Sequence, residues 1–243
     1  MADPHPLDRP AWTALRSTQR DLARGAGAAL RYDQDHAIFA ATGDHAPASL
    51  AALGTLIRAT GPAIVLQKDP LPPVPGAQAT THRMGVQMIA ETLAGGADID
   101  FVALGDADAA EMLALATLTE PGPYFARTHR LGGFIGIRDE GRLVAMAGER
   151  MKPAGFTEVS GVCTHPGWRG RGYAGRLMRV VAERIVARGE TPFLHAYADN
   201  RGAIALYESL GFRVRCAVNV TNLVPRPANG RADDRADSGP ATG

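Results

Sequence analysis

The sequence has few cysteines, almost no lysine and no long apolar segment. Its two cysteines, Cys163 and Cys216, lie in apolar strand-like stretches and show no C-x-x-C spacing. We therefore expect reduced, buried thiols, and neither a disulfide framework nor a bound metal. No run approaches the roughly 18 apolar residues of a membrane-spanning helix. This absence predicts no membrane partner.

An excess of charge of either sign is also missing. Lysine and arginine together number 26 and the acidic residues 25, which gives a net charge of +1 among 243 residues. No overall field therefore favours nucleic acid or an anionic membrane surface. The first ten residues, MADPHPLDRP, lack the apolar core of a secretory signal, so we expect a cytoplasmic protein.

Residues 1–97 carry no motif with recognisable chemistry. We expect them to form an N-terminal accessory α/β region, and their element order resembles a degenerate half-copy of the part that follows. Three helices are predicted from the spacing of apolar residues, over Ala11–Arg24, Pro47–Thr60 and Arg83–Leu93. A short apolar run, Ala63–Gln67, precedes a stretch crowded with proline.

Residues 98–224 show sharper patterns and are predicted to form the functional domain, followed by a flexible C-terminal tail over 225–243. A hairpin turns at Asp139–Gly141 between two apolar strands. The remaining predicted elements alternate between strands and helices: strand 99–105, helix 106–118, strand 156–164, helix 174–188, strand 191–198, helix 200–210 and strand 212–224.

A glycine-rich turn, HPGWRGRGYAGRL, occupies His165–Leu177 between a strand and a helix. Such a turn can hold a phosphate with free backbone N–H groups and the helix dipole. Gly170, Gly172 and Gly175 match G-x-G-x-x-G, but the acidic residue expected about 20 positions later falls at Glu190, before the next strand. No Gly-Lys-Ser/Thr follows either, so the sequence matches neither a dinucleotide fold nor an ATP-binding P-loop.

The turn is also strongly basic. Between His165 and Arg188 there are six arginines and a single acid, Glu183. A solvated helix face would explain an arginine run alone. Together with the glycine turn directly upstream, the run favours an anion site, and the phosphates of coenzyme A suit a helix N-terminus flanked by guanidinium groups.

Two further patterns carry a family resemblance. Arg169, Gly172 and Ala174 fit Q/R-x-x-G-x-G/A, and the stretch NRGAIALYESLGF, from Asn200 to Phe212, keeps every spacing of N-x-x-A-x-x-x-Y-x-x-x-G-F. In this order the motifs resemble the GNAT N-acetyltransferase superfamily. The resemblance implies a mixed α/β fold (α+β) with a central, mostly antiparallel sheet flanked by helices. It covers about 125 of the 243 residues.

The resemblance implies an acetyl-CoA-dependent transfer of an acetyl group directly to a primary amine, without a covalent enzyme intermediate. Acetyl-CoA would act as co-substrate, with its pantetheine arm along residues 158–164 and paired with the backbone of Val162 and Thr164. Its pyrophosphate would lie on the glycine turn. The residues implied in cofactor binding are Val162, Cys163, Thr164, Arg169, Gly170, Arg171, Gly172, Tyr173, Ala174 and Asn200.

Two residues are candidates for the proton transfers that acyl transfer to an amine requires. Glu158, 11 residues before Arg169, matches the place of a catalytic glutamate in several family members, and would act as base directly or through water. A structural ion pair is the alternative for this residue. Tyr207 is the candidate acid for the departing thiolate, with core packing as its alternative. Asn200 also suits the N-cap of its helix.

The acceptor is not identified by the sequence. His129, His195 and Tyr197 could line its pocket, although lone histidines are more often structural. A module that binds acyl-CoA without catalysis, as a sensor or an interaction domain, would keep the same glycine turn and remains the alternative function. The oligomeric state stays open, with a homodimer among the options, and no nucleic-acid partner is expected.

Overall fold

The computed structural model describes residues 5–93, 96 and 99–227. Its main feature is an eight-stranded sheet in the order β4-β11-β5-β10-β9-β8-β7-β6. Strands β9 and β10 pair in parallel, and the other neighbouring strands pair antiparallel. The predicted mixed α/β fold with a mostly antiparallel sheet is therefore confirmed. The strands are β4 (Ala63–Gln67), β5 (Ala77–Ile89), β6 (Val102–Leu104), β7 (Phe134–Asp139), β8 (Arg142–Glu149), β9 (Phe156–Thr164), β10 (Thr191–Tyr197) and β11 (Arg213–Pro225).

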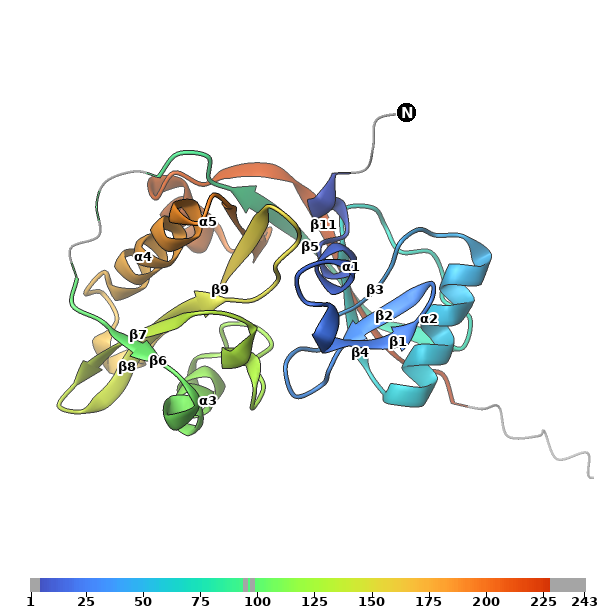
Figure 1. Cartoon of the computed structure of the whole chain (residues 1–243), viewed down its shortest axis with the longest axis horizontal. Helices are drawn as coiled ribbons and strands as arrows, with labels where there is room; N and C mark the ends of the chain where they lie inside the picture. Colours follow the sequence, from blue (N-terminus) through green and yellow to red (C-terminus); the bar gives the residue numbers. More distant parts are fainter. Residues whose placement is uncertain (1–4, 94–95, 97–98, 228–243) are drawn as a thin grey trace, which may run out of the picture.

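Helices cover both faces of this sheet (Figure 1). Successive side chains of a strand point to opposite faces, so neighbours such as Phe134 and Ile135 belong to different cores. On one face, Ile135 packs in a cluster with the apolar side of α4 (Tyr173–Ala187), and α5 (Arg201–Ser209) adds to it. On the other face, Phe134 packs with α3 (Ala109–Thr119).

The N-terminal part adds a second, three-stranded sheet beside the first. Its antiparallel strands β1 (Ala23–Ala26), β2 (Ala29–Tyr32) and β3 (Ala40–Thr42) lie against α1 and α2. Helix α2 spans Pro47–Thr60, as predicted. The helix predicted over Ala11–Arg24 is wrong in its second half, because α1 ends at Arg16 and the chain continues into β1.

The helix predicted over Arg83–Leu93 is also wrong, because β5 occupies most of this stretch. Its side chains alternate as in a strand: Val86 and Met88 contribute to the core under α4, whereas Ile89 faces the N-terminal core. Gly85 marks the strand as well, since a Cβ there would lie 2.8 Å from the carbonyl oxygen of Ala196 on β10. The apolar spacing was compatible with both structures, and pairing with two neighbouring strands decides between them.

Strands from the N-terminal part are built into the large sheet. β4 and β5 both pair with β11, and one buried cluster joins Leu7 and Phe39 to Phe193 and Val218. In Figure 1 the long strands β5 and β11 run from one lobe into the other. The predicted boundary at 97/98 stays a prediction, and so does the half-copy idea. Most of the predicted tail, from residue 228, lies outside the described residues.

The parallel pair β9–β10 separates soon after it begins. Only Phe156–Glu158 of β9 pair with β10, although β9 continues to Thr164 and β10 to Tyr197. On its other side β9 pairs with β8, with a bulge at Gly161, whose φ is +63°. A wedge therefore opens between two neighbouring strands of the sheet. None of the helices in the described ranges is long and apolar enough to cross a bilayer.

Candidate active site

The glycine turn has the conformation that its sequence predicts. After β9 ends at Thr164, the chain makes a single 3-10 turn and passes through Gly170 and Gly172 before α4 begins at Tyr173. The φ angles of the two glycines, +79° and +73°, lie in the left-handed region that disfavours a side chain. Gly172 occupies the N-cap and gives α4 no side-chain cap, so the N–H groups of its first turn are available to an anion.

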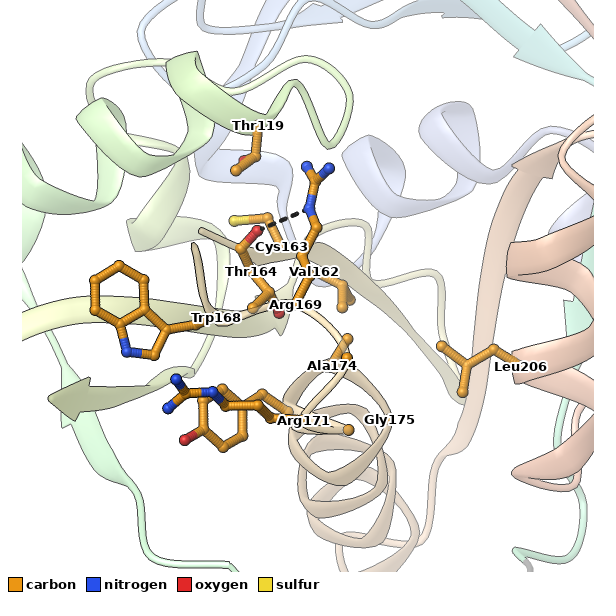
Figure 2. A pocket seen from close by; sticks show the side chains of 13 residues that line it. Thr119, Val162, Cys163, Thr164, Trp168, Arg169, Arg171, Ala174, Gly175 and Leu206 are labelled. Carbon is orange, nitrogen blue, oxygen red and sulfur yellow. Dashed lines mark hydrogen bonds between the residues drawn. The ribbon is translucent and has the colours of Figure 1, made fainter. Parts of the chain in front are cut away.

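A cavity of about 470 Å³ lies over this turn (Figure 2). It is lined by nine of the ten residues predicted to bind the cofactor, all except Asn200. Arg169 and Arg171 are among the described residues of its wall, and no acidic residue is. The wall is therefore positively charged, as an anion site requires.

The free edge of β9 continues this cavity. Beyond Glu158 the side of β9 that faces β10 has no strand partner within the described chain, whereas Thr164 and Cys163 still pair with β8 on the opposite side. An unpaired strand edge presents N–H and C=O groups that an extended amide chain can bind. Val162 and Thr164 lie on this stretch, where the pantetheine arm is predicted.

Cys163, in the same wall, is a free and buried thiol. Burial raises its pKa to about 11, so the group stays protonated at neutral pH. Cys216 is also free and half-buried. The predicted burial is therefore confirmed for Cys163, whereas Cys216 is only partly buried.

A second cavity, of about 550 Å³, brings the two predicted catalytic residues together. Glu158 enters it from β9 and Tyr207 from α5, on either side of the wedge. It meets the first cavity, because Thr119, Val162, Ala174 and Leu206 line both. The two cavities are therefore adjacent, and Glu158 borders the second.

Asn200 lies in the second cavity rather than the first. Its side-chain oxygen accepts a hydrogen bond from the N–H of Ala203 at 3.2 Å, so it caps α5. The predicted capping role is confirmed. Its cofactor contact stays a prediction.

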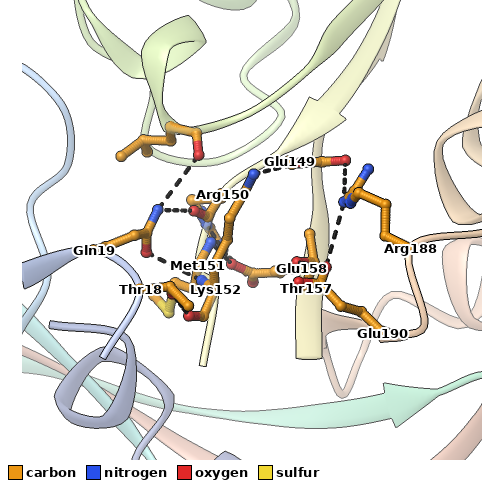
Figure 3. Close-up of polar contacts among 11 residues, drawn as sticks. Thr18, Gln19, Glu149, Arg150, Met151, Lys152, Thr157, Glu158, Arg188 and Glu190 are labelled. Atoms are coloured by element: carbon orange, nitrogen blue, oxygen red, sulfur yellow. Dashed lines mark hydrogen bonds and ion pairs between the residues drawn. The ribbon is translucent and has the colours of Figure 1, made fainter. Parts of the chain in front are cut away.

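Glu158 is fully buried and densely hydrogen-bonded. The Arg150 guanidinium donates two hydrogen bonds to its carboxylate at 2.7 and 2.9 Å, and the N–H of Met151 donates a third at 3.2 Å (Figure 3). His195 Nδ1 lies 2.7 Å from its Oε1. Burial alone would raise the pKa of the carboxyl, but Arg150 and then His195 hold it below its usual range. Glu158 is therefore an ionised carboxylate in a structural ion pair that also borders the cavity.

His195 is held from both ring nitrogens. Its Nδ1 donates to Glu158, and its Nε2 lies 3.0 Å from the Nε2 of Gln87, whose amide donates to it. Because Gln87 Oε1 accepts from Arg215, the orientation of this amide is fixed. This arrangement lets Nδ1–H face Glu158 while Nε2 accepts from the Gln87 amide.

Tyr207 combines core packing with access to the cavity. Its ring packs against the cluster under α4, and the residue also lines the second cavity. Burial raises the pKa of its phenol, which keeps the hydroxyl protonated at neutral pH. Both interpretations of Tyr207 from the sequence are therefore compatible with its position.

The other polar candidates divide between the site and the scaffold. Tyr197 lines the second cavity, with the Arg83 guanidinium 3.5 Å from its ring centroid. His129 lines neither cavity and bonds Asp106 at 2.7 Å. His165 accepts a hydrogen bond from the N–H of Gly167, a contact within the turn itself.

Several residues of the second cavity carried no signal in the sequence. Arg150 lies in a connection after β8, and Glu120 follows α3 with a left-handed φ of +49°. Phe39, Ile64 and Leu66 come from the N-terminal part, where no chemical motif was found. Only their positions in the folded chain reveal them.

The N-terminal part also holds the segment that carries Arg150. Gln19 donates to the carbonyl of Arg150 at 2.8 Å and accepts from the N–H of Lys152 at 3.0 Å (Figure 3). Tyr32 donates to the same Gln19 side chain at 2.7 Å. The guanidinium carbon of Arg150 lies over the ring of Phe39, 4.7 Å from the ring centroid. Arg150 is thereby oriented toward Glu158 from both parts of the chain.

Comparison with known proteins agrees with this site. The family model described as FR47-like protein matches residues 134–220. The N-alpha-acetyltransferase RimI of Mycobacterium tuberculosis is 37% identical over 84 residues, which is 33% of this chain. The match spans about half of that relative, 51% of its length.

Two solved structures extend the likeness to most of the chain. A GCN5-related N-acetyltransferase from Kribbella flavida shares the fold at 19% identity, with a TM-score of 0.63, over 91% of this chain and 96% of its own. A GNAT-family protein from Novosphingobium aromaticivorans is 45% identical, with a TM-score of 0.84, over 92% of this chain and 100% of its own. The glycine turn, the wedge in the sheet and this relative together show that the chain belongs to the GNAT family of N-acetyltransferases.

Proposed function

We propose that this chain transfers the acetyl group of acetyl-CoA directly to a primary amine in a ternary complex. The observation that carries the proposal is the junction of the two cavities at the wedge between β9 and β10. A thioester along the free edge of β9 would present its carbonyl carbon to an amine in the second cavity. The amine nitrogen forms the new C–N bond as the C–S bond breaks, so no enzyme nucleophile is needed.

The cofactor side of the proposal uses mainly backbone groups. The N–H groups at Gly172 and the start of α4 would bind the pyrophosphate, with Arg169 and Arg171 neutralising its charge. The main chain of Val162 and Thr164 would pair with the pantetheine amides, because this edge of β9 has no other strand partner in the described chain.

Tyr207 is the proton donor in this proposal. It lines the cavity on the α5 side of the wedge, and its raised pKa keeps a proton on the oxygen until charge develops on the departing sulfur. The donated proton yields free coenzyme A as a thiol. Packing of the ring in the core would hold the hydroxyl in place.

Glu158 acts together with His195 in the proposal, not as an isolated base. A carboxyl with a lowered pKa binds a proton poorly, but its charge stabilises a protonated imidazole beside it. His195 Nε2 would take the ammonium proton after the Gln87 amide has released that nitrogen. Glu158 would then hold the imidazolium through Nδ1.

The test uses purified protein, acetyl-CoA and a panel of amines, with free thiol and acetylated amine measured in parallel. The proposal predicts equal amounts of the two products. A binding module without catalysis would show a higher melting temperature with coenzyme A but no thiol release in the presence of any amine. That result would contradict the proposal.

The role of His195 is tested by the pH dependence of the rate. His195→Gln removes the base, so the loss should be largest at low pH, where the amine is most protonated, and should diminish as the pH rises. Glu158→Gln should show the same trend. A pH-independent loss in both variants would assign the pair a purely structural role.

A further inference from the structure

The two adjacent cavities, the halves of the site, differ in their walls. The first has two arginines and no acidic residue among the described residues of its wall, whereas the side of the second that faces the N-terminal part is apolar. Its apolar wall consists of Phe39, Ile64, Leu66, Val218 and Val220. Such a wall favours a ligand that can bury hydrocarbon and gives no hydrogen bonds to a polyhydroxylated one.

The wall of the second cavity has more acidic than basic side chains among its described residues. Glu120 and Glu158 contribute two carboxylates and Arg150 one guanidinium, so these three groups sum to a formal charge of −1. Arg150 is the one arginine or lysine among the described residues of the wall, and both of its hydrogen bonds of 2.7 and 2.9 Å go to Glu158. The guanidinium of this wall is therefore already paired, and the nearest others are Arg83, on the ring of Tyr197, and Arg169, in the wall of the first cavity.

Glu120 supplies the charge that is not compensated. It follows α3 in the left-handed region and lines the cavity with Pro121–Pro123, immediately after Thr119, which lines both cavities. None of the ion pairs found among the described residues includes it. Glu120 is exposed, and it borders the second cavity directly after Thr119, which lines both cavities.

We infer that the acceptor is a primary amine that carries an apolar side chain and has no carboxylate beside the amino group. This inference rests on the proposed function. The ammonium is attracted by Glu120, and the apolar side chain lies against the wall formed with the N-terminal part. A neighbouring carboxylate would face Glu120 and Glu158, and the guanidinium of this wall is already paired. A free amine and the N-terminus of a peptide share this chemistry.

The experiment compares kcat/KM at saturating acetyl-CoA for four acceptors. Phenethylamine and phenylalanine differ by the carboxylate, and ethanolamine lacks the apolar group. A short peptide amide with N-terminal phenylalanine represents the second source. The inference predicts that phenethylamine or the peptide exceeds both phenylalanine and ethanolamine by at least about tenfold. Whichever of phenethylamine and the peptide has the higher kcat/KM shows whether the acceptor is a free amine or a peptide N-terminus.

Two pairs of variants locate the effect. Val220→Thr keeps the shape of the wall and adds a hydroxyl, so kcat/KM for the preferred amine should fall about three- to tenfold. Val214→Thr, at an exposed position of the same strand, should leave it unchanged. Glu120→Gln should lower kcat/KM about two- to fivefold, most at low ionic strength. Glu140→Gln, which has the same φ of +49° but lines neither cavity, is its control.

The outcomes distinguish a failure of the inferred acceptor class from a failure of the proposed transferase function. Acetylation of phenylalanine or ethanolamine at a rate equal to that of phenethylamine and the peptide would overturn the inference while the transferase function stands. Equal losses in Val220→Thr and Val214→Thr would overturn it too. If none of the acceptors is acetylated and no thiol is released, both the inference and the proposed function fail.

Discussion

The two halves of the cavity are built in opposite ways. The half over the glycine turn comes from one continuous stretch, Val162–Gly175, with only Thr119 and Leu206 added. The half around Glu158 is lined by side chains from the N-terminal part, the loop after α3, and β9, β10, α5 and β11. The first half relies on backbone geometry, which a short motif encodes. The second relies on side chains that only the complete fold brings together.

This difference explains how far the sequence could predict the site. Gly170 and Gly172 have left-handed φ angles, which glycine adopts more readily than other residues. The residue types alone therefore indicate a tight turn here. Glu158 could be located by its spacing, but its ion pair with Arg150 could not, because it depends on the pairing of β8 with β9. Nothing in the sequence around Ile64 or Leu66 connects them with a site more than 90 residues later.

The fold shows the same contrast. The helix Pro47–Thr60 was predicted with its observed bounds, and α4 and α5 within a residue, whereas the helix predicted over 106–118 begins only at Ala109. The stretch Arg83–Leu93 was not, because β5 is defined by its partners β10 and β11, which follow about 100 residues later in the chain. Local patterns predict local structure, and long-range pairing overrides them.

The largest expected effect separates chemistry from binding at the junction of the two halves. Tyr207→Phe keeps the ring in the core and removes the proton donor, so kcat should fall about 10²–10⁴-fold. The affinity for coenzyme A should hardly change, because the phenol matters most as charge develops on sulfur. Steady-state kinetics and calorimetric titration of coenzyme A provide the two readouts. A variant as active as the parent would assign Tyr207 to packing alone.

The next effect tests what stabilises the half around Glu158. Arg150→Met leaves the fully buried Glu158 without its guanidinium, which should cost about 3–5 kcal/mol in the free energy of unfolding. The double variant with Glu158→Leu removes both charges and should recover much of the loss. Urea denaturation measures each variant. If the single variant is as stable as the parent, the pair contributes nothing to the fold.

A third change addresses the half over the glycine turn, and its control lies beyond the other end of α4. Gly172→Val places a β-branched residue at a φ of +73° directly at the predicted phosphate site. Gly189→Val imposes the same strain at +77° beyond the other end of α4. Both variants should lose about 1–3 kcal/mol of stability. Only the first should lose coenzyme A affinity, by about 100-fold, as measured by titration. Equal affinities in the two variants would place the pyrophosphate elsewhere.

The smallest effect concerns a carboxylate outside both halves. Hydrogen bonds from Arg130 and then His129 lower the pKa of Asp106 to about 2. Its ordinary pKa in an unfolded chain is about 4, so its contribution is present above pH 4 and is lost as the pH falls toward 2. Asp106→Asn should therefore reduce the decline in stability over this interval. Activity at neutral pH should stay unchanged. An identical acid-unfolding curve would show that the contact contributes nothing in solution.

The central claim is that one half binds acetyl-CoA and the other binds the amine while both are bound together. Initial rates over a matrix of acetyl-CoA and phenethylamine concentrations test it directly, for the parent, Gly172→Val and Val220→Thr. A ternary-complex mechanism predicts intersecting reciprocal plots, a raised KM for acetyl-CoA in Gly172→Val, and a raised KM for the amine in Val220→Thr. Parallel reciprocal plots, or the same KM raised in both variants, would contradict it.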